Sequence, residues 1–474
     1  MSPLLFISLL VVYVYTVVSS ISVILLENRN AVRSLSWILV LVFLPFIGVF
    51  LYLVIGQNYR KQKVISKKSV RHNAKSPPVE LHPEEYTEFV THASHLNLIR
   101  LLHKNSDAAA YAFNKIEVLS EGTATFTAMF EAIGAAKQHI HLEFFIFEDD
   151  RISNELRKVL IQKARAGVRV RMIYDYLGSF GLGHNYLKSL REAGVYVRPF
   201  LPLRLRLRRS KINFRNHRKI LIVDGKYGFT GGLNFADRYL FGNTLGKWRD
   251  TFVRFEGAAV HGLQSQFLTD WYFVERKLIT DSKYYPAPRK FEENVVQIVS
   301  SGPDTDWESI MQGMATAIMS ARHYVYMHTP YFVPNDVILN AITVAALSGT
   351  DVRLMIPYRS DSRLSDACTF SYMGEILEAG VKVYQYTRGF LHSKAIVVDD
   401  FISIIGSANL DERSFNQNFE ANAFIYDKET SVRLKELFLN DIHNCRQLSL
   451  DDWDNRKRFQ KIKESFARLF SPII

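Results

Sequence analysis

The sequence predicts an α/β protein: two tandem α/β sandwich domains with pseudo-two-fold symmetry, preceded by an N-terminal two-helix transmembrane hairpin. Two long uncharged apolar runs occupy the first part of the chain. The rest alternates short apolar strands with helices in two similar halves, and each half contains a copy of the same polar motif. Alternating strands and helices favour an α/β architecture, and two similar halves favour a duplicated domain.

The N-terminal runs indicate membrane helices. No charged residue lies between Pro3 and Leu26, or between Leu35 and Gly56. Because a helix of about 20 apolar residues spans a bilayer, we expect transmembrane helices at about 3–26 and 35–56, within a segment 1–56. A cleaved signal peptide fits less well, since no basic residues precede the first run and signal peptides have only about 7–15 apolar residues. Two buried helices of a soluble protein are the other alternative.

Charge predicts the orientation and the kind of partner. The formal net charge of +12 favours anionic partners, whether lipid headgroups, nucleic acid or phosphorylated substrates. Basic residues crowd the stretch from Arg60 to Lys75, and no acid lies between Gly56 and Glu80. Because basic flanks remain in the cytoplasm, we expect a multi-pass cell-membrane protein with its larger part on the cytoplasmic side. Residues 57–111, polar and interrupted by prolines, are predicted to be a basic juxtamembrane linker that contacts anionic lipid.

The remaining chain repeats one order of elements. We predict a first domain over 112–290 and a second over 291–448, related by a pseudo-two-fold axis. A site at their interface would draw equivalent residues from each half. In each half a strand-like segment, a helical segment and a buried strand follow one another. In order, these segments are 139–147, 154–166 and 167–175 in the first half, and 324–333, 336–348 and 351–357 in the second.

Each half also contains His-x-Lys-x4-Asp, followed at the same distance by Gly-[Gly/Ser]-x-Asn. One such pattern arises easily by chance, but two with identical spacing at equivalent places indicate a shared site. In a strand, successive side chains point to opposite faces. His and Lys of each copy are two residues apart, so their side chains should point to the same face. The eight motif residues are His217, Lys219, Asp224 and Asn234, and His392, Lys394, Asp399 and Asn409.

These residue types suit phosphoryl transfer. A neutral imidazole can attack phosphorus and form a covalent intermediate, and a second imidazole can protonate the leaving alcohol. Lysine ammonium groups and asparagine amides can hold the non-bridging oxygens as charge develops. No cofactor and no metal is expected, because the motifs contain no carboxylate cluster of the kind that a two-metal site requires.

The motifs resemble those of the phospholipase D superfamily, and the closest resemblance is to the bacterial cardiolipin synthase family. It implies two phospholipase D-like domains, a phosphohistidine on one motif histidine, and conversion of two phosphatidylglycerol molecules into cardiolipin and glycerol. Segments beyond the motifs carry the resemblance to this family. They are Ile55-Gly56-Gln57-Asn58, Asn213-Phe214-Arg215-Asn216, Phe235-Ala236-Asp237-Arg238-Tyr239 and Ala467-Arg468-Leu469-Phe470-Ser471-Pro472.

The resemblance also implies supporting residues. A downstream acid should fix the tautomer of each histidine, Glu420 for His392 and Asp250 for His217. Asp224 and Asp399 complete the catalytic motifs, but family precedent makes them more structural than chemical. Precedent favours the N-terminal histidine as nucleophile, although the sequence itself leaves the choice open. One departure stands out: the first copy has Gly231-Gly232 where the second has Gly406-Ser407.

An insertion before the first motif is a candidate lipid contact. Gly194 precedes His217 by 23 residues, whereas Gly380 precedes His392 by 12. The eleven extra residues lie within 199–211, where leucine alternates with arginine. In an extended segment the leucines would share one face, suited to a membrane interface, and the arginines would share the other. A plain surface β-hairpin is the alternative.

The C-terminal stretch is the second lipid candidate. Residues 449–474 are predicted to form a basic amphipathic helix that lies either on a membrane or on the protein core. Apolar side chains recur near helical spacing at Trp453, Phe459, Ile462, Phe466 and Leu469.

Other activities remain open to the same motifs. Another phospholipase D-type phosphatidyltransferase, or a phospholipase D hydrolase that releases phosphatidic acid, would need the same residues. A membrane-bound nuclease fits the charge but not the apolar N-terminus, and a scaffold with a degenerate site does not fit two intact motifs. We therefore expect phosphatidylglycerol, anionic membrane lipids and the membrane as partners, with no nucleic acid and with an oligomer possible.

Overall fold

The computed structural model describes residues 3–26, 31–44, 47–52, 90, 93–202 and 213–473. The chain divides into two compact units. The smaller comprises Met1–Val64 with Leu203–Asn213, and the larger comprises Ile65–Pro202 with Phe214–Ile474. Most of the leucine–arginine insertion, from residue 203 to residue 212, lies outside the described residues.

The smaller unit contains the helices α1 (Pro3–Leu26), α2 (Ala31–Phe43) and α3 (Ile47–Leu51), which pack around Ile24, Leu41 and Tyr52. The second apolar run is therefore not one helix over 35–56. Pro45 stands in the sequence between α2 and α3, and a proline lacks the N–H that would continue a helix. Within the described ranges, no helix is both long and apolar enough for a membrane crossing, so the expected hairpin is not confirmed.

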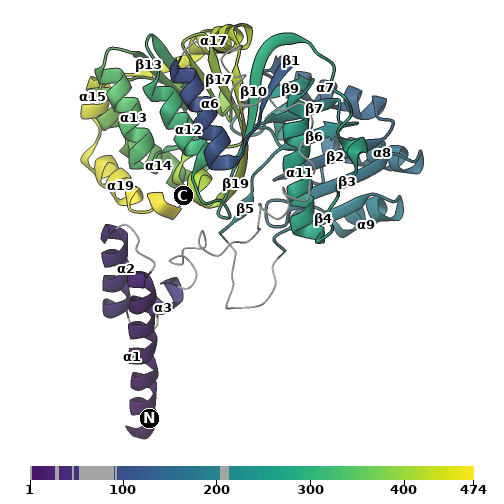
Figure 1. The fold of residues 1–474 in the computed structure, drawn as a ribbon. Helices are drawn as coiled ribbons and strands as arrows, with labels where there is room; N and C mark the ends of the chain where they lie inside the picture. Colours follow the sequence, from purple (N-terminus) through teal and green to yellow (C-terminus); the bar gives the residue numbers. More distant parts are fainter. Residues whose placement is uncertain are drawn as a thin grey trace. The chain divides into compact units, whose positions relative to one another are not determined.

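The larger unit is built on one continuous sheet in which the strand order of one half mirrors that of the other (Figure 1). At its centre β1 and β10 pair antiparallel, and equivalent strands of the two halves follow outward in the same order. The first half contributes, outward, β1 (Ala110–Leu119), β9 (Phe252–Glu256), β7 (Tyr227–Gly231), β6 (Ile220–Val223), β2 (His139–Phe144), β3 (Arg169–Asp175) and β4 (Tyr196–Phe200). The second contributes β10 (Glu292–Ser301), β19 (Asn418–Tyr426), β17 (Ile402–Gly406), β16 (Ala395–Val398), β11 (Tyr324–His328), β13 (Asp351–Pro357), β14 (Lys382–Tyr386) and β20 (Cys445–Leu448).

Helices cover both faces of each half of the sheet. In the first half α7 (Gly122–Ala135), α8 (Arg151–Arg165) and α9 (His184–Glu192) form one layer, and α11 (Ala259–Glu275) packs separately from them. In the second half α12 (Ser309–Met319), α13 (Asp336–Leu347) and α15 (Met373–Glu378) form one layer, and α17 (Lys428–Ile442) forms the other. The two α/β sandwiches are thus present, but they share one sheet and one compact unit.

The predicted linker ends earlier than residue 111. Residues Ala93–Ser106 form helix α6, whose Leu98, Ile99 and Leu102 are fully buried against α12 and β10. The reason is that apolar side chains at this spacing share one helix face, which covers the sheet next to the centre. Residues 57–89 and 91–92 of the predicted linker lie outside the described residues.

The C-terminal segment forms two helices instead of one. Helix α18 (Leu450–Asp454) places Trp453 in the core, and α19 (Arg458–Arg468) follows after a short break. A 3-10 turn, η4 (Ser471–Ile473), comes last. Residues 455–457, which are not helical, separate α18 from α19.

Candidate active site

The two motif histidines lie at the seam between the halves. His217 follows β5 (Arg215–Asn216), which pairs with β19 of the other half. Its backbone N–H donates to the Phe419 carbonyl at 2.9 Å. His392 follows β15 (Gly389–Leu391), which pairs with β8 (Lys247–Arg249), and its N–H donates to the Arg249 carbonyl at 2.8 Å. Each motif is therefore hydrogen-bonded to the half that does not contain it.

The acid partners of the histidines are crossed relative to the sequence prediction. Nδ1 of His217 lies 2.9 Å and 3.0 Å from the two carboxylate oxygens of Glu420, and Nδ1 of His392 lies 2.6 Å from Oδ2 of Asp250. The prediction of Glu420 for His392 and Asp250 for His217 is therefore wrong. The reason is the seam pairing described above, which sets each histidine beside the residue that precedes the other half's acid.

Burial keeps both imidazoles neutral. The two side chains are nearly inaccessible to water, and burial lowers the pKa of His217 to about 4 although Glu420 opposes this. Burial, together with Lys394 and Lys219, lowers the pKa of His392 well below its usual value, and His217 contributes to the same effect. The two rings are thus close enough to interact electrostatically, and each is held as the neutral base that nucleophilic attack requires.

The two carboxylates differ in protonation. Burial raises the pKa of Asp250 to about 7 against the opposing charge of Lys394. Burial acts in the same direction on Glu420, but His217 and Lys219 outweigh it and lower the pKa of Glu420 below its usual value. Near neutral pH Asp250 is therefore close to its pKa and can gain or lose a proton, whereas Glu420 is ionised.

The motif lysines are buried cations beside the histidines. Lys219 and Lys394 donate to the carbonyl oxygens of His217 and His392, at 2.6 Å and 2.5 Å. Burial lowers the pKa of Lys394 to about 8 and also lowers the pKa of Lys219 well below its usual value, while Asp250 and Glu420 oppose both shifts. Two buried cations near two imidazoles provide the charge that an anionic phosphodiester needs.

The motif asparagines occupy the same region. Nδ2 of Asn234 donates to the Tyr239 hydroxyl at 2.9 Å, and Nδ2 of Asn409 donates to Asp411 at 2.8 Å. The side-chain oxygen of Asn409 is buried and has no hydrogen-bond partner among the described residues. The amides are therefore held in place by their own neighbours.

The motif aspartates lie away from the histidines. Asp224 is at the far end of β6, where its carboxylate accepts from the backbone N–H groups of residues 137, 138 and 139. Asp399 does the same for residues 322, 323 and 324. Their inclusion among the catalytic candidates is therefore corrected, because each carboxylate is used to fix the turn that precedes a strand.

Comparisons with known proteins show which family the chain belongs to. A family model described as "Cardiolipin synthase, PLD-like domain" matches residues 129–271 and 314–442, and one described as "Phospholipase_D-nuclease N-terminal" matches residues 12–57. Cardiolipin synthase 2 of Bacillus anthracis is 40% identical over 95% of this chain and 89% of its own length. The major cardiolipin synthase of Bacillus subtilis is 39% identical over 98% of both chains. The chain belongs to the bacterial cardiolipin synthase family.

A solved structure shows the same fold at lower identity. Phosphatidylserine synthase of Haemophilus influenzae matches with a TM-score of 0.60 and 15% identity, over 80% of this chain and 100% of that one. The likeness confirms the α/β fold, and the family model that matches two segments identifies the two phospholipase D-like repeats.

The sequence prediction assigned no role to two residues inside the motifs of this cardiolipin synthase family member, Arg218 and Ser393. Arg218, fully buried, donates from Nε to the Glu420 carbonyl at 3.1 Å and from Nη1 to Asp270 at 2.6 Å. At the equivalent position Ser393 shares a 2.7 Å hydrogen bond with Thr251, the residue after Asp250. Each residue between His and Lys thus contacts the segment that carries its histidine's acid, and its motif position was the available signal.

The Gly-Gly departure in the first motif has a steric reason in this family member. A Cβ at Gly232 would lie 2.2 Å from Oδ1 of Asp250. At the equivalent place Ser407 donates from Oγ to Oε2 of Glu420 at 2.5 Å. The two acid sites are therefore built differently, and only Glu420 has a hydroxyl donor at this position.

Proposed function

We propose that the protein is a cardiolipin synthase that transfers a phosphatidyl group from one phosphatidylglycerol to another and releases glycerol. The observation that carries the proposal is the crossed pairing of His217 with Glu420 and of His392 with Asp250. Two oriented imidazoles flanked by buried lysines suit the double displacement of a phosphodiester. Family membership adds the choice of lipid, since the named relatives are cardiolipin synthases.

His217 is the nucleophile in this proposal. Its Nδ1–H donates to the ionised Glu420, which leaves the Nε2 lone pair free for attack and stabilises positive charge on the ring. Nε2 bonds to phosphorus, and the bond from phosphorus to the headgroup glycerol breaks. The His392–Asp250 pair delivers its proton through Nε2 of His392 to the departing glycerol oxygen. Lys219 and Lys394 stabilise the additional negative charge on the non-bridging oxygens.

The second half of the reaction reverses the roles. A hydroxyl of the headgroup of a second phosphatidylglycerol attacks the phosphohistidine, and its proton returns to the His392–Asp250 pair. The phosphorus–nitrogen bond breaks and His217 is again neutral. Water in place of this hydroxyl would yield phosphatidic acid, so the site must favour the lipid alcohol over water.

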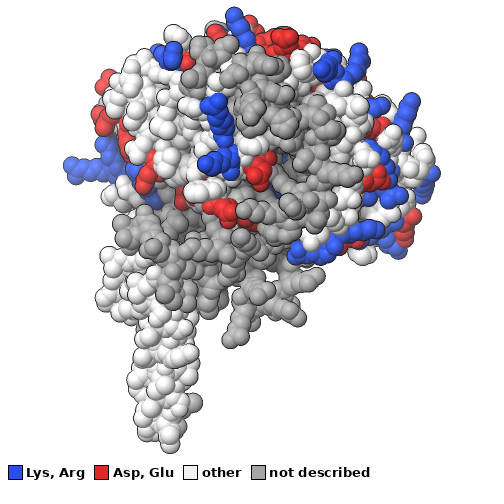
Figure 2. All heavy atoms as spheres, viewed as in Figure 1, with Lys and Arg blue, Asp and Glu red and all other residues white. Residues whose placement is uncertain are grey.

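The N-terminal unit is proposed to attach the protein to the membrane that holds its substrate. Helix α1 is uncharged, and large apolar side chains along it, such as Leu4, Val11 and Tyr15, are more than half exposed. Figure 2 shows the described atoms of α1 without Lys, Arg, Asp or Glu. Apolar surface of this extent is typical of a membrane contact. The larger unit would then act on the cytoplasmic side, as the basic residues after Gly56 predict.

Incubation of the purified full chain with phosphatidylglycerol bilayers tests the proposal. We expect cardiolipin and glycerol in equal amounts, and neither product from a His217→Ala, His392→Ala double variant. Phosphatidic acid as the only lipid product would instead support a hydrolase. DNA cleavage faster than lipid turnover would support a nuclease.

A further inference from the structure

Helix α19 exposes a continuous apolar face. The side chains of Phe459, Ile462, Phe466 and Leu469 have exposed fractions of 79%, 67%, 61% and 71%. Their spacing of three, four and three residues places them on one side of the helix. Exposed apolar patches of large side chains mark contact with another surface more often than chance.

The opposite side of α19 is fixed to the larger unit. Glu464 and Ala467 are buried, and the Glu464 carboxylate pairs with Arg456 at 3.2 Å. The Ala467 carbonyl accepts from Sγ of Cys368 in α14 (Arg363–Ser371) at 2.8 Å. The helix is thus held through small and polar residues, which leaves its large apolar side chains outside. From the sequence, docking on the core and contact with a membrane are alternatives, whereas this arrangement permits both.

Charge on α19 indicates which surface it meets. Arg458, Lys461 and Lys463 are exposed beside the apolar face, and the only acid of the helix, Glu464, is buried. An apolar stripe flanked by cations suits a bilayer interface with anionic headgroups. We propose that α19 docks on the surface of an anionic membrane, with these four apolar side chains in the headgroup–acyl boundary. The inference rests on the proposed function for its catalytic consequence.

The contact would bring the membrane to the side of the molecule that holds the site. The Pro472 carbonyl in η4 accepts from Nε2 of Gln417 at 3.0 Å. Gln417 follows the short helix α16 (Glu412–Asn416), which in the sequence lies between Asn409 and Glu420. In Figure 1, α19 and the C-terminus lie along the same lower edge of the larger unit as β5, which precedes His217.

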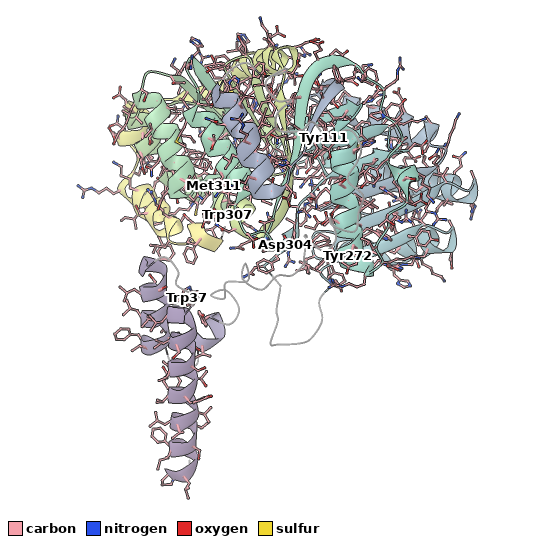
Figure 3. All side chains as sticks on the ribbon, in the orientation of Figure 1. Trp37, Tyr111, Tyr272, Asp304, Trp307 and Met311 are labelled. Carbon is pink, nitrogen blue, oxygen red and sulfur yellow. The ribbon has the colours of Figure 1, made fainter. Side chains whose placement is uncertain are left out.

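Two further residues mark this edge. Figure 3 places Trp307, which is 55% exposed, and Asp304 along it. Asp304 lies close enough to Arg218 for the two charges to interact. A bilayer against this edge would therefore lie beside the loop that approaches Arg218, the neighbour of His217.

Nitroxide depth measurement on the full chain tests the docking directly. A spin label is placed at Phe466→Cys or, as a matched control one residue away, at Ser465→Cys, with Cys445→Ser to remove the half-exposed native thiol. In vesicles of phosphatidylglycerol and phosphatidylcholine, we expect the label at 466 to be accessible to oxygen and shielded from a water-soluble nickel chelate. The label at 465 should be more accessible to nickel.

Two results would overturn the inference. Equal nickel access at 466 and 465 would mean that the face stays in water. Shielding of 466 from both oxygen and nickel would mean that protein covers it, either a second copy or another part of this chain.

A catalytic comparison separates this inference from the proposed function. Phosphatidylglycerol is supplied either in bilayers or as a short-chain form below its micellar concentration. For Ile462→Asp with Phe466→Asp we expect about tenfold slower turnover on bilayers and a rate within about twofold of wild type on the dissolved lipid. Ser465→Asp, which adds charge off the apolar face, should match wild type on both. Equal rates on bilayers, or equal losses on both substrates, would contradict docking, whereas no turnover by wild type on either substrate would contradict the proposed function instead.

Discussion

Replacing Glu420 with glutamine tests the crossed pairing most sharply. The carboxylate has no exposed surface, and both of its oxygens lie within 3.0 Å of Nδ1 of His217. Glutamine keeps the shape of the side chain and removes its charge, so the fold should tolerate it better than a truncation. The imidazole of His217 becomes positively charged as it bonds to phosphorus, and the substitution removes the group that stabilises that charge.

The expected loss of rate follows from the free energy that a buried hydrogen bond to a charged group contributes. Such bonds contribute about 1.5–3 kcal/mol, which corresponds to a rate loss of about 10- to 200-fold. Asp250→Asn, the matched variant at the other pair, should also slow turnover, but by removing the proton for the leaving glycerol. The two losses therefore belong to different chemical events.

A leaving group that needs no proton distinguishes these events. With a phosphatidyl ester of p-nitrophenol, the release of nitrophenolate reports attack on phosphorus alone. We expect Asp250→Asn to recover most of the wild-type rate of release, and Glu420→Gln to remain slow. Recovery by Glu420→Gln with continued slowness of Asp250→Asn would refute the assignment of roles. Wild-type activity of Glu420→Gln on both substrates would refute the pairing itself.

Three further predictions concern the residues around the pairs. Gly232→Ser should lower turnover at least about tenfold, because its Cβ would meet Asp250 at 2.2 Å. Ser407→Gly removes one donor to Glu420 and should lower turnover less. Equal effects of the two substitutions on kcat would contradict this. Arg218→Met should destabilise the protein by about 3–5 kcal/mol, since Asp270 loses its buried cation. Adding Asp270→Asn should restore part of the lost melting temperature. No recovery in the double variant would contradict the pairing of Arg218 with Asp270. Burial lowers the pKa of His217 and of His139 to about 4, so the folded protein favours the neutral form of each. Each group therefore contributes about 3 kcal/mol of stability, which is complete above about pH 6.5 and is lost as the pH falls towards 4. A melting temperature that does not fall between pH 6.5 and 4 would contradict this.

The sequence predicted which histidines and lysines meet, but not how their acids are arranged. Two motifs at equal spacing in two halves require a shared site, and the structure places His217 and His392 at one seam. The acids depend on which strand lies beside each motif. That is decided by the pairing of β5 with β19 and of β15 with β8, elements too short to predict from periodicity.

Long-range burial explains the other differences. Nothing in the local sequence marks Asp270 as the partner of Arg218, because the two meet only when α11 packs on the sheet. Helix α6 was assigned to a linker because its surroundings are polar, although Leu98, Ile99 and Leu102 have the spacing of a buried face. The charged flanks of α19 were visible in the sequence, but the side on which it docks was not.

Trapping and mapping the phosphorylated residue tests the central claim most directly. The full chain is mixed with phosphatidylglycerol, quenched in alkali, which preserves phosphohistidine, and digested for mass spectrometry. We expect modification of His217, retained or increased in Asp250→Asn and absent from His217→Ala. Modification of His392 instead, or product formation by His217→Ala at the wild-type rate, would contradict it.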